Sequence, residues 1–368
     1  MFGPAFPSSP LFRLGVRYPI IQAPMAGTST PALAAAVSNA GGLGSLGMGA
    51  STPAAARKAI EETKRLTDKP FNVNLFVHEK GVANATNEAE WLSFLRPVFA
   101  EYGAQPPEGV QEIYKTFKED EEMLEVLLDT KPAVVSFHFG LPAEAIIRRL
   151  RENGAVLLGS ATNLEEARRI EASGLDMIIA QGAEAGGHRG MFDPTIPDDE
   201  LSTFALTTLL LKSSKLPIIP AGGIMDGAGI LGYLTLGCPF VQMGTAFILT
   251  PESGADAGFR AALKGPGAEH TRLTPLISGR PARCLQNKWT DLATKLEGRV
   301  QPAYPMAYDA GKALHAAAKA KGEEGYGAHW AGQGAPAARE MGAGEMVRLL
   351  VQEIEEARDR IASNRSNL

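Results

Sequence analysis

Residues 175–190 read LDMIIAQGAEAGGHRG, and this stretch determines how the rest of the chain is interpreted. The apolar run over residues 177–181 predicts a strand that is buried on both faces. The glycines that follow it permit positive φ angles and let the backbone approach a ligand closely. His188 can exchange a proton near neutral pH. Because ligands bind at the carboxyl ends of parallel strands, we expect a site directly after this strand.

Seven further apolar runs resemble this one and alternate with helical patterns such as Thr52–Leu66 and Asn163–Ala172. Eight β-then-α units over about 250 residues predict an α/β protein with a (β/α)8 TIM barrel. A doubly wound open sheet is the alternative. The predicted strands are Pro19–Pro24, Leu43–Met48, Phe71–Val77, Ala133–Phe139, Val156–Ser160, Met177–Gln181, Pro217–Ala221 and Phe240–Gly244.

Two regions exceed what a minimal barrel needs. Residues 79–130 form an insertion with charged, helix-like stretches that include Lys118–Asp129. After residue 250 the pattern becomes helical and irregular. We therefore expect a ligand-binding barrel over residues 1–250 and a mainly helical cap over residues 251–368 that contributes to a substrate pocket. The amphipathic segment Met341–Ile361 fits packing on its own barrel or on a second copy, so monomer and homodimer both stay open.

Composition excludes several classes of protein. The chain is 45% hydrophobic with a net charge of -5, which argues against global disorder and gives no electrostatic case for nucleic acid or anionic membrane. No run of about 18 apolar residues predicts a membrane span. Cys238 and Cys284 lack metal-ligand spacing and fit a reducing cytoplasm. The segment Met1–Pro7 lacks the features of a signal peptide. We expect a cytoplasmic protein without a metal.

A phosphate site is predicted after the seventh and eighth strands. Gly222 and Gly223 close the seventh strand, and residues 242–245, QMGT, close the eighth. Barrels often bind phosphate with the loops at these two places, where backbone N–H groups and a helix start face the ligand. The alternative is that these glycines only serve the turns.

A second glycine pattern is a weaker candidate. Residues 42–47, GLGSLG, match the dinucleotide fingerprint GxGxxG. That fingerprint must follow a strand and open a helix. Residues 32–40 before it are alanine-rich and helical, so a Rossmann site is disfavoured.

Polar side chains also gather at strand ends. Gln22, Asn72, Asn74 and Gln181 carry amides, which can donate and accept hydrogen bonds at the edge of a heterocycle. An amide of this kind can equally be a core residue satisfied by backbone, but several at one mouth favour a ligand.

Two of the six histidines, His138 and His188, follow predicted strands, whereas the other four fall in loops or on helix surfaces. Two histidines at one mouth favour a functional role, above all for His188.

Tyr304, Tyr308 and Lys312 are spaced four apart in a predicted helix over Ala303–Ala318, so they share one face. The sequence alone favours an amphipathic stripe with Lys312 reaching water. If this helix lies over the site, two phenols and an ammonium would instead bind a small anion.

Five motifs in order resemble the nitronate monooxygenase family, formerly called 2-nitropropane dioxygenases. They are residues 22–27 (QAPMAG), 70–74 (PFNVN), 180–190, 220–224 (PAGGI) and 242–247 (QMGTAF). The resemblance covers residues 18–255 and extends to the Tyr304–Lys312 helix. The EAGGHRG run is similar to the class I subgroup.

The resemblance implies an FMN-containing barrel that oxidises alkyl nitronates, such as propionate 3-nitronate or small aliphatic ones, with O2 to a carbonyl compound and nitrite. The family reaction proceeds by one-electron transfer and an anionic flavin semiquinone. His188 would be catalytic. His138, Tyr304, Tyr308 and Lys312 would bind substrate. The implied FMN contacts are Met25, Asn72, Gln181, Gly186, Gly187, Gly223, Gln242, Met243, Gly244 and Thr245.

Two questions stay open at this point. A protonated His188 would stabilise an anionic nitronate, whereas a neutral His188 would act as base on a neutral nitroalkane. Related barrels are NAD(P)H-dependent enoyl or quinone reductases, and a barrel that only binds a phosphate-bearing ligand is a third possibility.

Overall fold

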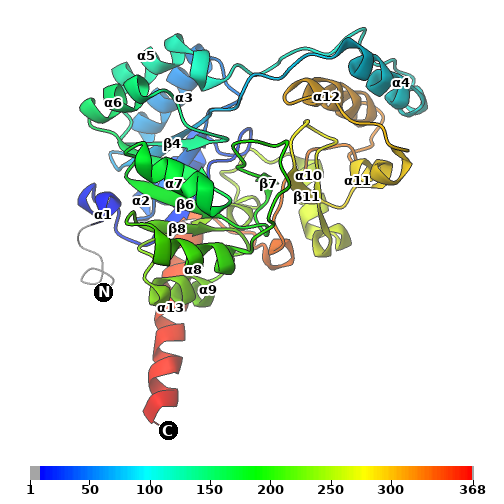
Figure 1. Cartoon of the computed structure of the whole chain (residues 1–368). Helices are drawn as coiled ribbons and strands as arrows, with labels where there is room; N and C mark the ends of the chain where they lie inside the picture. Colours follow the sequence, from blue (N-terminus) through cyan, green and yellow to red (C-terminus); the bar gives the residue numbers. More distant parts are fainter. Residues whose placement is uncertain (1–8, 367–368) are drawn as a thin grey trace.

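Eight parallel strands form the centre of the molecule (Figure 1). The computed structural model describes residues 9–366; the Met1–Pro7 segment lies outside the described residues. Strand order in the sheet is β1-β9-β8-β6-β5-β4-β3-β2. The strands are β1 Ile20–Gln22, β2 Gly44–Gly47, β3 Phe71–Phe76, β4 Val134–His138, β5 Val156–Ala161, β6 Met177–Gln181, β8 Ile218–Ala221 and β9 Val241–Met243.

The sheet closes on itself between its first and last strands. A parallel bridge joins Ile21 to Leu43, just before β2. The Leu43 N–H donates to the Ile20 carbonyl, and the Gln22 N–H donates to the Leu43 carbonyl, both at 2.9 Å. An open doubly wound sheet has no such closure. The predicted (β/α)8 barrel is confirmed, with all eight strands at the predicted places.

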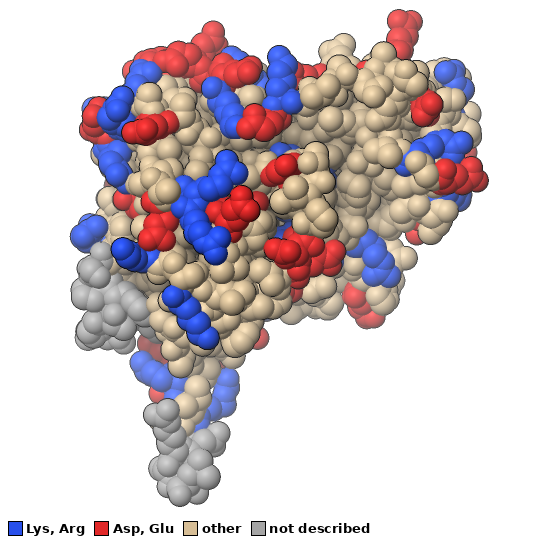
Figure 2. Space-filling view, in the orientation of Figure 1, with Lys and Arg blue, Asp and Glu red and all other residues tan. Residues whose placement is uncertain are grey.

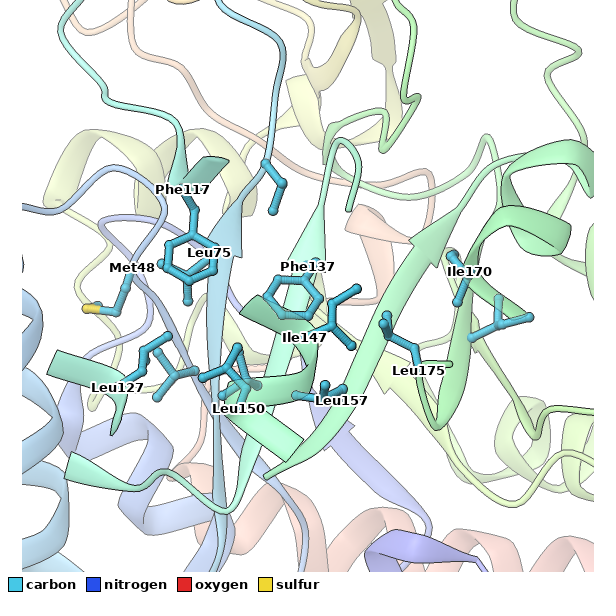
Figure 3. Close-up of a cluster of buried hydrophobic side chains, with 14 of the residues drawn as sticks. Met48, Leu75, Phe117, Leu127, Phe137, Ile147, Leu150, Leu157, Ile170 and Leu175 are labelled. Carbon is cyan, nitrogen blue, oxygen red and sulfur yellow. The ribbon is translucent and has the colours of Figure 1, made fainter. Parts of the chain in front are cut away.

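Helices surround this barrel because the outer faces of the strands are apolar. Phe137 of β4 and Leu157 of β5 pack under Ile147 and Leu150 of α6 (Figure 3). Each such side chain contributes roughly 1.5–3 kcal/mol when fully buried. The surrounding helices are α2 Pro31–Asn39, α3 Pro53–Leu66, α5 Glu121–Thr130, α6 Glu144–Glu152, α7 Leu164–Ala172, α8 Thr203–Ser213, α9 Gly227–Leu236 and α13 Ala343–Ser366.

The bottom of the barrel interior is filled by apolar side chains. Leu11 from the short helix α1, Pro10–Arg13, packs with Leu43, Met177 and Phe240. This plug leaves the opposite end, at the carboxyl ends of the strands, for polar residues and a ligand.

Additional elements gather beside that end (Figure 1). Helix α4, Ala85–Glu101, packs against α12, Met306–Lys319, together with α11, Lys288–Leu292. A three-stranded antiparallel sheet, in the order β10-β11-β7, joins Thr271–Thr274, Ala282–Leu285 and Gly187–His188. No pattern in the sequence predicts this sheet, because the two residues of β7 are too few to show alternation. Helix α10, Ala257–Lys264, completes this layer.

The last helix lies in the ring around the barrel. Apolar residues of α13, among them Met346 and Leu350, pack with Ile230 of α9 and Leu33 of α2. Its carboxyl end extends away from the body of the molecule (Figure 1). The division into a barrel over 1–250 and a cap over 251–368 stays a prediction, and α13 is the part of the second segment that packs as a barrel helix.

Charged side chains of both signs are interspersed on the face shown in Figure 2. Within residues 9–366, no helix is both long and apolar enough to cross a membrane.

The GLGSLG pattern is explained by packing. Gly44 and Gly47 lie within strand β2. A Cβ on Gly44 would stand 1.9 Å from the Ala34 carbonyl oxygen of α2. The glycine therefore permits close helix–strand packing and opens no nucleotide loop.

We predict that Gly44→Ala lowers the free energy of unfolding by about 3 kcal/mol or more, because the backbone of α2 must move away. Urea denaturation measures this. Gly232→Ala, in a helix interior with nothing within 4 Å of the added Cβ, is the control and should stabilise slightly, by up to about 1 kcal/mol. Equal stability of the two variants would contradict the packing argument.

Candidate active site

A cavity of about 660 Å³ lies at the carboxyl ends of the strands. This volume is typical of a site for a cofactor or small ligand. The cavity brings together most of the residues singled out from the sequence, from six strand ends and from α12. Those that line it are Met25, Asn74, His138, Gln181, Gly186, Gly187, His188, Gly222, Gly223, Gln242, Met243, Gly244, Thr245, Tyr308 and Lys312.

Asn72 lies below the cavity and does not line it. Its side chain is fully buried and donates to the hydroxyls of Ser45 (3.2 Å) and Ser136 (3.0 Å). Asn74, two residues nearer the carboxyl end of β3, points to the same face and reaches the cavity. The geometry thus favours Asn74 over Asn72 as a ligand contact.

Tyr304 lies behind the cavity wall. The predicted helix starts at Met306, so Tyr304 precedes α12 and only Tyr308 and Lys312 share its face. The Tyr304 side chain is 4% exposed, and its ring centroid is 5.5 Å from that of His188. Tyr304 therefore packs against the His188 ring and does not itself line the cavity.

The loops after β8 and β9 form a polar cradle. Gly222 and Gly223 have φ angles of 130° and 71°, which side chains disfavour. Thr245 opens the 3-10 helix Thr245–Phe247 directly after β9, and its hydroxyl oxygen accepts from the Gly332 N–H at 3.0 Å. The side-chain oxygen of Gln242 is buried without a partner among the described residues. Such an orphaned acceptor beside a helix start fits a ligand that carries both a donor and a phosphate.

His188 lies on β7, where it pairs with Ala282 of β11. Its ring Nε2 is 2.8 Å from the Ser278 hydroxyl, and Ser278 is fully buried. Burial lowers the pKa of His188 from 6.5 to about 3, and the charge of Arg280 contributes to the lowering. His188 is therefore neutral at pH 7, the protonation state that the sequence left open.

His138 stands next to it, on β4. Its Nε2 lies 3.1 Å from the His188 carbonyl oxygen. Because a carbonyl oxygen only accepts, Nε2 carries the proton and Nδ1 does not. Burial lowers the pKa of His138 to about 4, so this ring is neutral as well.

A buried cation lies beside these histidines, and no sequence pattern pointed to it. Arg280 is 3% exposed, donates to the Met191 carbonyl at 2.7 Å and stacks over Phe139, 4.4 Å from the ring centroid. Burial lowers its pKa to about 10, which still leaves it charged at pH 7. Phe139 has a φ of 74°, a strained conformation for a bulky residue.

Lys312 is exposed at the mouth of the cavity. Its Nζ lies 4.7 Å from the ring centroid of Tyr114 and 5.3 Å from that of Tyr308. Burial raises the pKa of each of these tyrosines to about 12, so both phenols are neutral donors. Tyr114 belongs to the 79–130 insertion and was not anticipated, because a lone tyrosine in an irregular segment carries no signal.

His78 and His329 lie in loops, as predicted, but both are buried. His78 is fully buried, and neither ring nitrogen has a partner among the described residues. His315 faces Asp256 and Glu324, with ligand atoms of the three within 4.8 Å of one another. Lys319 pairs with both carboxylates, at 3.5 Å from Glu324. This cluster is thus an ion-pair network, and the absence of a metal stays a prediction.

The family model described as Nitronate monooxygenase matches residues 9–353. The chain belongs to the nitronate monooxygenase family. Enzymes of this family are oxidoreductases that act on nitronates and depend on a flavin. The sequence resemblance is confirmed.

Individual relatives agree with this membership. The nitronate monooxygenase of Paraburkholderia phytofirmans is 57% identical over 344 residues, 94% of each chain. That of Pseudomonas aeruginosa is 52% identical over 341 residues, 93% of this chain and 97% of the relative. A solved nitroalkane oxidase from Streptomyces ansochromogenes superposes with a TM-score of 0.87 at 39% identity, covering 96% of this chain and 100% of that one.

The lowered histidine pKa values predict a pH dependence of stability. Between pH 6.5 and about 4, His138 and His188 become protonated in the unfolded chain but stay neutral in the folded chain. The free energy of unfolding therefore falls as pH falls. Urea unfolding at several pH values measures the slope of the free energy of unfolding against pH. His188→Asn should reduce this slope by the equivalent of about one proton. His270→Asn, at an exposed position, should leave the slope unchanged. An unaltered slope in His188→Asn would show that His188 is not held neutral.

Proposed function

We propose that this enzyme uses FMN to oxidise alkyl nitronates with O2 to a carbonyl compound and nitrite. The observation that carries the proposal is that one cavity joins the β8 and β9 glycine loops to His188, Tyr308 and Lys312. A phosphate cradle and an anion-binding wall thus face the same space. Membership of the nitronate monooxygenase family supports this assignment.

The cradle suits FMN because FMN ends in a phosphate. The N–H groups around Gly223 and Gly244 and the hydroxyl of Thr245 would hold that phosphate. The unpartnered Gln242 oxygen and the Asn74 amide would meet donors and acceptors of the ring system. Bound there, FMN would supply the electron transfer and the reaction with O2.

The opposite wall suits a small anion. The Lys312 ammonium and the neutral phenols of Tyr114 and Tyr308 can donate to the two oxygens of a nitronate. Burial of the Tyr114 side chain makes its hydrogen bond stronger than in water. These groups would orient the substrate carbon toward the flavin.

His188 would act in its neutral form. Its pKa of about 3 removes it as the cation that balances a nitronate, so that role falls to Lys312. A neutral imidazole can donate one hydrogen bond and accept another, or take a proton from the carbon of a nitroalkane. The first role serves nitronates and the second extends the enzyme to neutral nitroalkanes.

We predict that His188→Asn retains bound FMN and lowers turnover of ethylnitronate roughly 10²-fold or more, since a positioned proton donor or acceptor is lost. Nitrite formation and oxygen uptake measure turnover, and the visible spectrum of the purified protein measures flavin content. Wild-type turnover in the variant would remove His188 from the mechanism, and a protein without flavin would assign it a structural role.

The same assay separates the competing activities. Nitronate oxidation without consumption of NADH or NADPH is the expected result for the wild type. Rapid consumption of either nicotinamide with no effect on nitronates would make the chain a flavin reductase on the same barrel. If the bound flavin reacts with neither nitronates nor nicotinamides, the protein would only bind its ligand and would not be an enzyme of either class.

A further inference from the structure

The connection from β6 to α8, residues 182–202, carries His188 and is held by a buried ion pair. Arg189 is 1% exposed, and two of its nitrogens donate to the Asp198 carboxylate, Nε to Oδ2 at 2.6 Å and Nη2 to Oδ1 at 3.0 Å. Burial by itself raises the pKa of Asp198, but the hydrogen bonds and charge of Arg189 outweigh it and lower the pKa below its ordinary value. Asp198 is therefore ionised at pH 7, and the paired fork fixes the plane of the guanidinium.

The third nitrogen of Arg189 continues this contact into the barrel. Its Nη1 donates to the Gln181 carbonyl oxygen at 2.9 Å. Both polar atoms of the Gln181 side chain then hydrogen-bond to the backbone of the 182–202 connection. Its oxygen accepts from the Gly190 N–H at 2.7 Å, and its nitrogen donates to the His188 carbonyl oxygen at 2.9 Å.

The backbone of His188 is thus fixed from three sides. Gln181 and His138 donate to its carbonyl oxygen, and β11 pairs with it at Ala282. The ring is then set by the 2.8 Å contact to Ser278. A backbone shift at His188 would move the ring relative to Ser278 and to anything bound in the cavity.

We propose that Asp198, Arg189 and Gln181 form a positioning network for His188. Neither Asp198 nor Arg189 lines the cavity, so both act on the reaction through Gln181 and the backbone of His188. The proposal rests on the proposed function, in which His188 serves nitronate turnover. One proton of the Gln181 nitrogen stays uncommitted, so a contact of Gln181 with flavin is compatible with this role.

A double-mutant cycle tests the network. Asp198→Asn keeps the shape and removes the charge that orients Arg189. We expect kcat for ethylnitronate to fall on the order of 10- to 100-fold with flavin content and KM nearly unchanged, because small misplacements of a catalytic group cost this much. In a His188→Asn background, the same substitution should change turnover less than about 2-fold, since the group that it positions is gone. Arg189→Lys keeps the positive charge but loses the paired hydrogen bonds to Asp198, and its effect should depend on His188 in the same way. This variant replaces Asp198→Asn if Asp198→Asn does not fold.

Asp129→Asn is the matched control, since it removes the carboxylate of an exposed ion pair with Arg57 at 2.8 Å. It should leave turnover unchanged in both backgrounds. If Asp198→Asn lowers turnover equally with and without His188, the network serves only general stability and the proposal is overturned. If Asp198→Asn lowers turnover in neither background, the proposal is overturned as well.

A readout without turnover separates this proposal from the proposed function. In protein labelled with 15N at histidine, the ring signals of His188, assigned by their loss in His188→Asn, should shift in Asp198→Asn and stay in place in Asp129→Asn. Unshifted signals overturn the network. A wild type that oxidises no nitronate while these signals shift overturns the proposed function instead.

Discussion

Parallel pairing in a closed ring is the constraint on which the site depends. Eight strands that run the same way must all end at one rim, and the bridge between Ile21 and Leu43 makes that rim a circle. Residues far apart in the chain, from Met25 to Thr245, therefore meet around one cavity. Within residues 9–366, buried apolar side chains fill the other end of the barrel, so the cavity lies at this rim.

The part of the cavity near β4, β7 and α12 favours a negative ligand. The two histidines that line it near β4 and β7 are neutral, and cations stand on both sides of them. Arg280 lies behind Phe139, and within residues 9–366 no carboxylate forms an ion pair with it. Lys312 stands at the mouth. Arg280 is buried, so its charge stabilises an anion more than it would in water, whereas Lys312 is exposed to solvent.

Much of this arrangement could be predicted from the sequence, because buried parallel strands are nearly continuous apolar runs. All eight strands, and the polar residues that their carboxyl ends bring to the cavity, follow from such runs. The remainder depends on contacts that no local pattern encodes. Arg280 and Ser278 come from a segment without periodicity, and β7 is too short to show alternation. Whether Asn72 or Asn74 reaches the cavity depends on where the strand ends, and the neutrality of His188 depends on what surrounds it.

The most direct measurement is an anaerobic spectrum of the flavin-loaded protein mixed with ethylnitronate and, separately, with NADPH. We expect the visible absorption of the bound flavin to change on mixing with the nitronate and to stay unchanged with the nicotinamide. Fast bleaching by NADPH with no response to the nitronate would contradict it, because the wall of Tyr308, Lys312 and His188 would then serve another substrate.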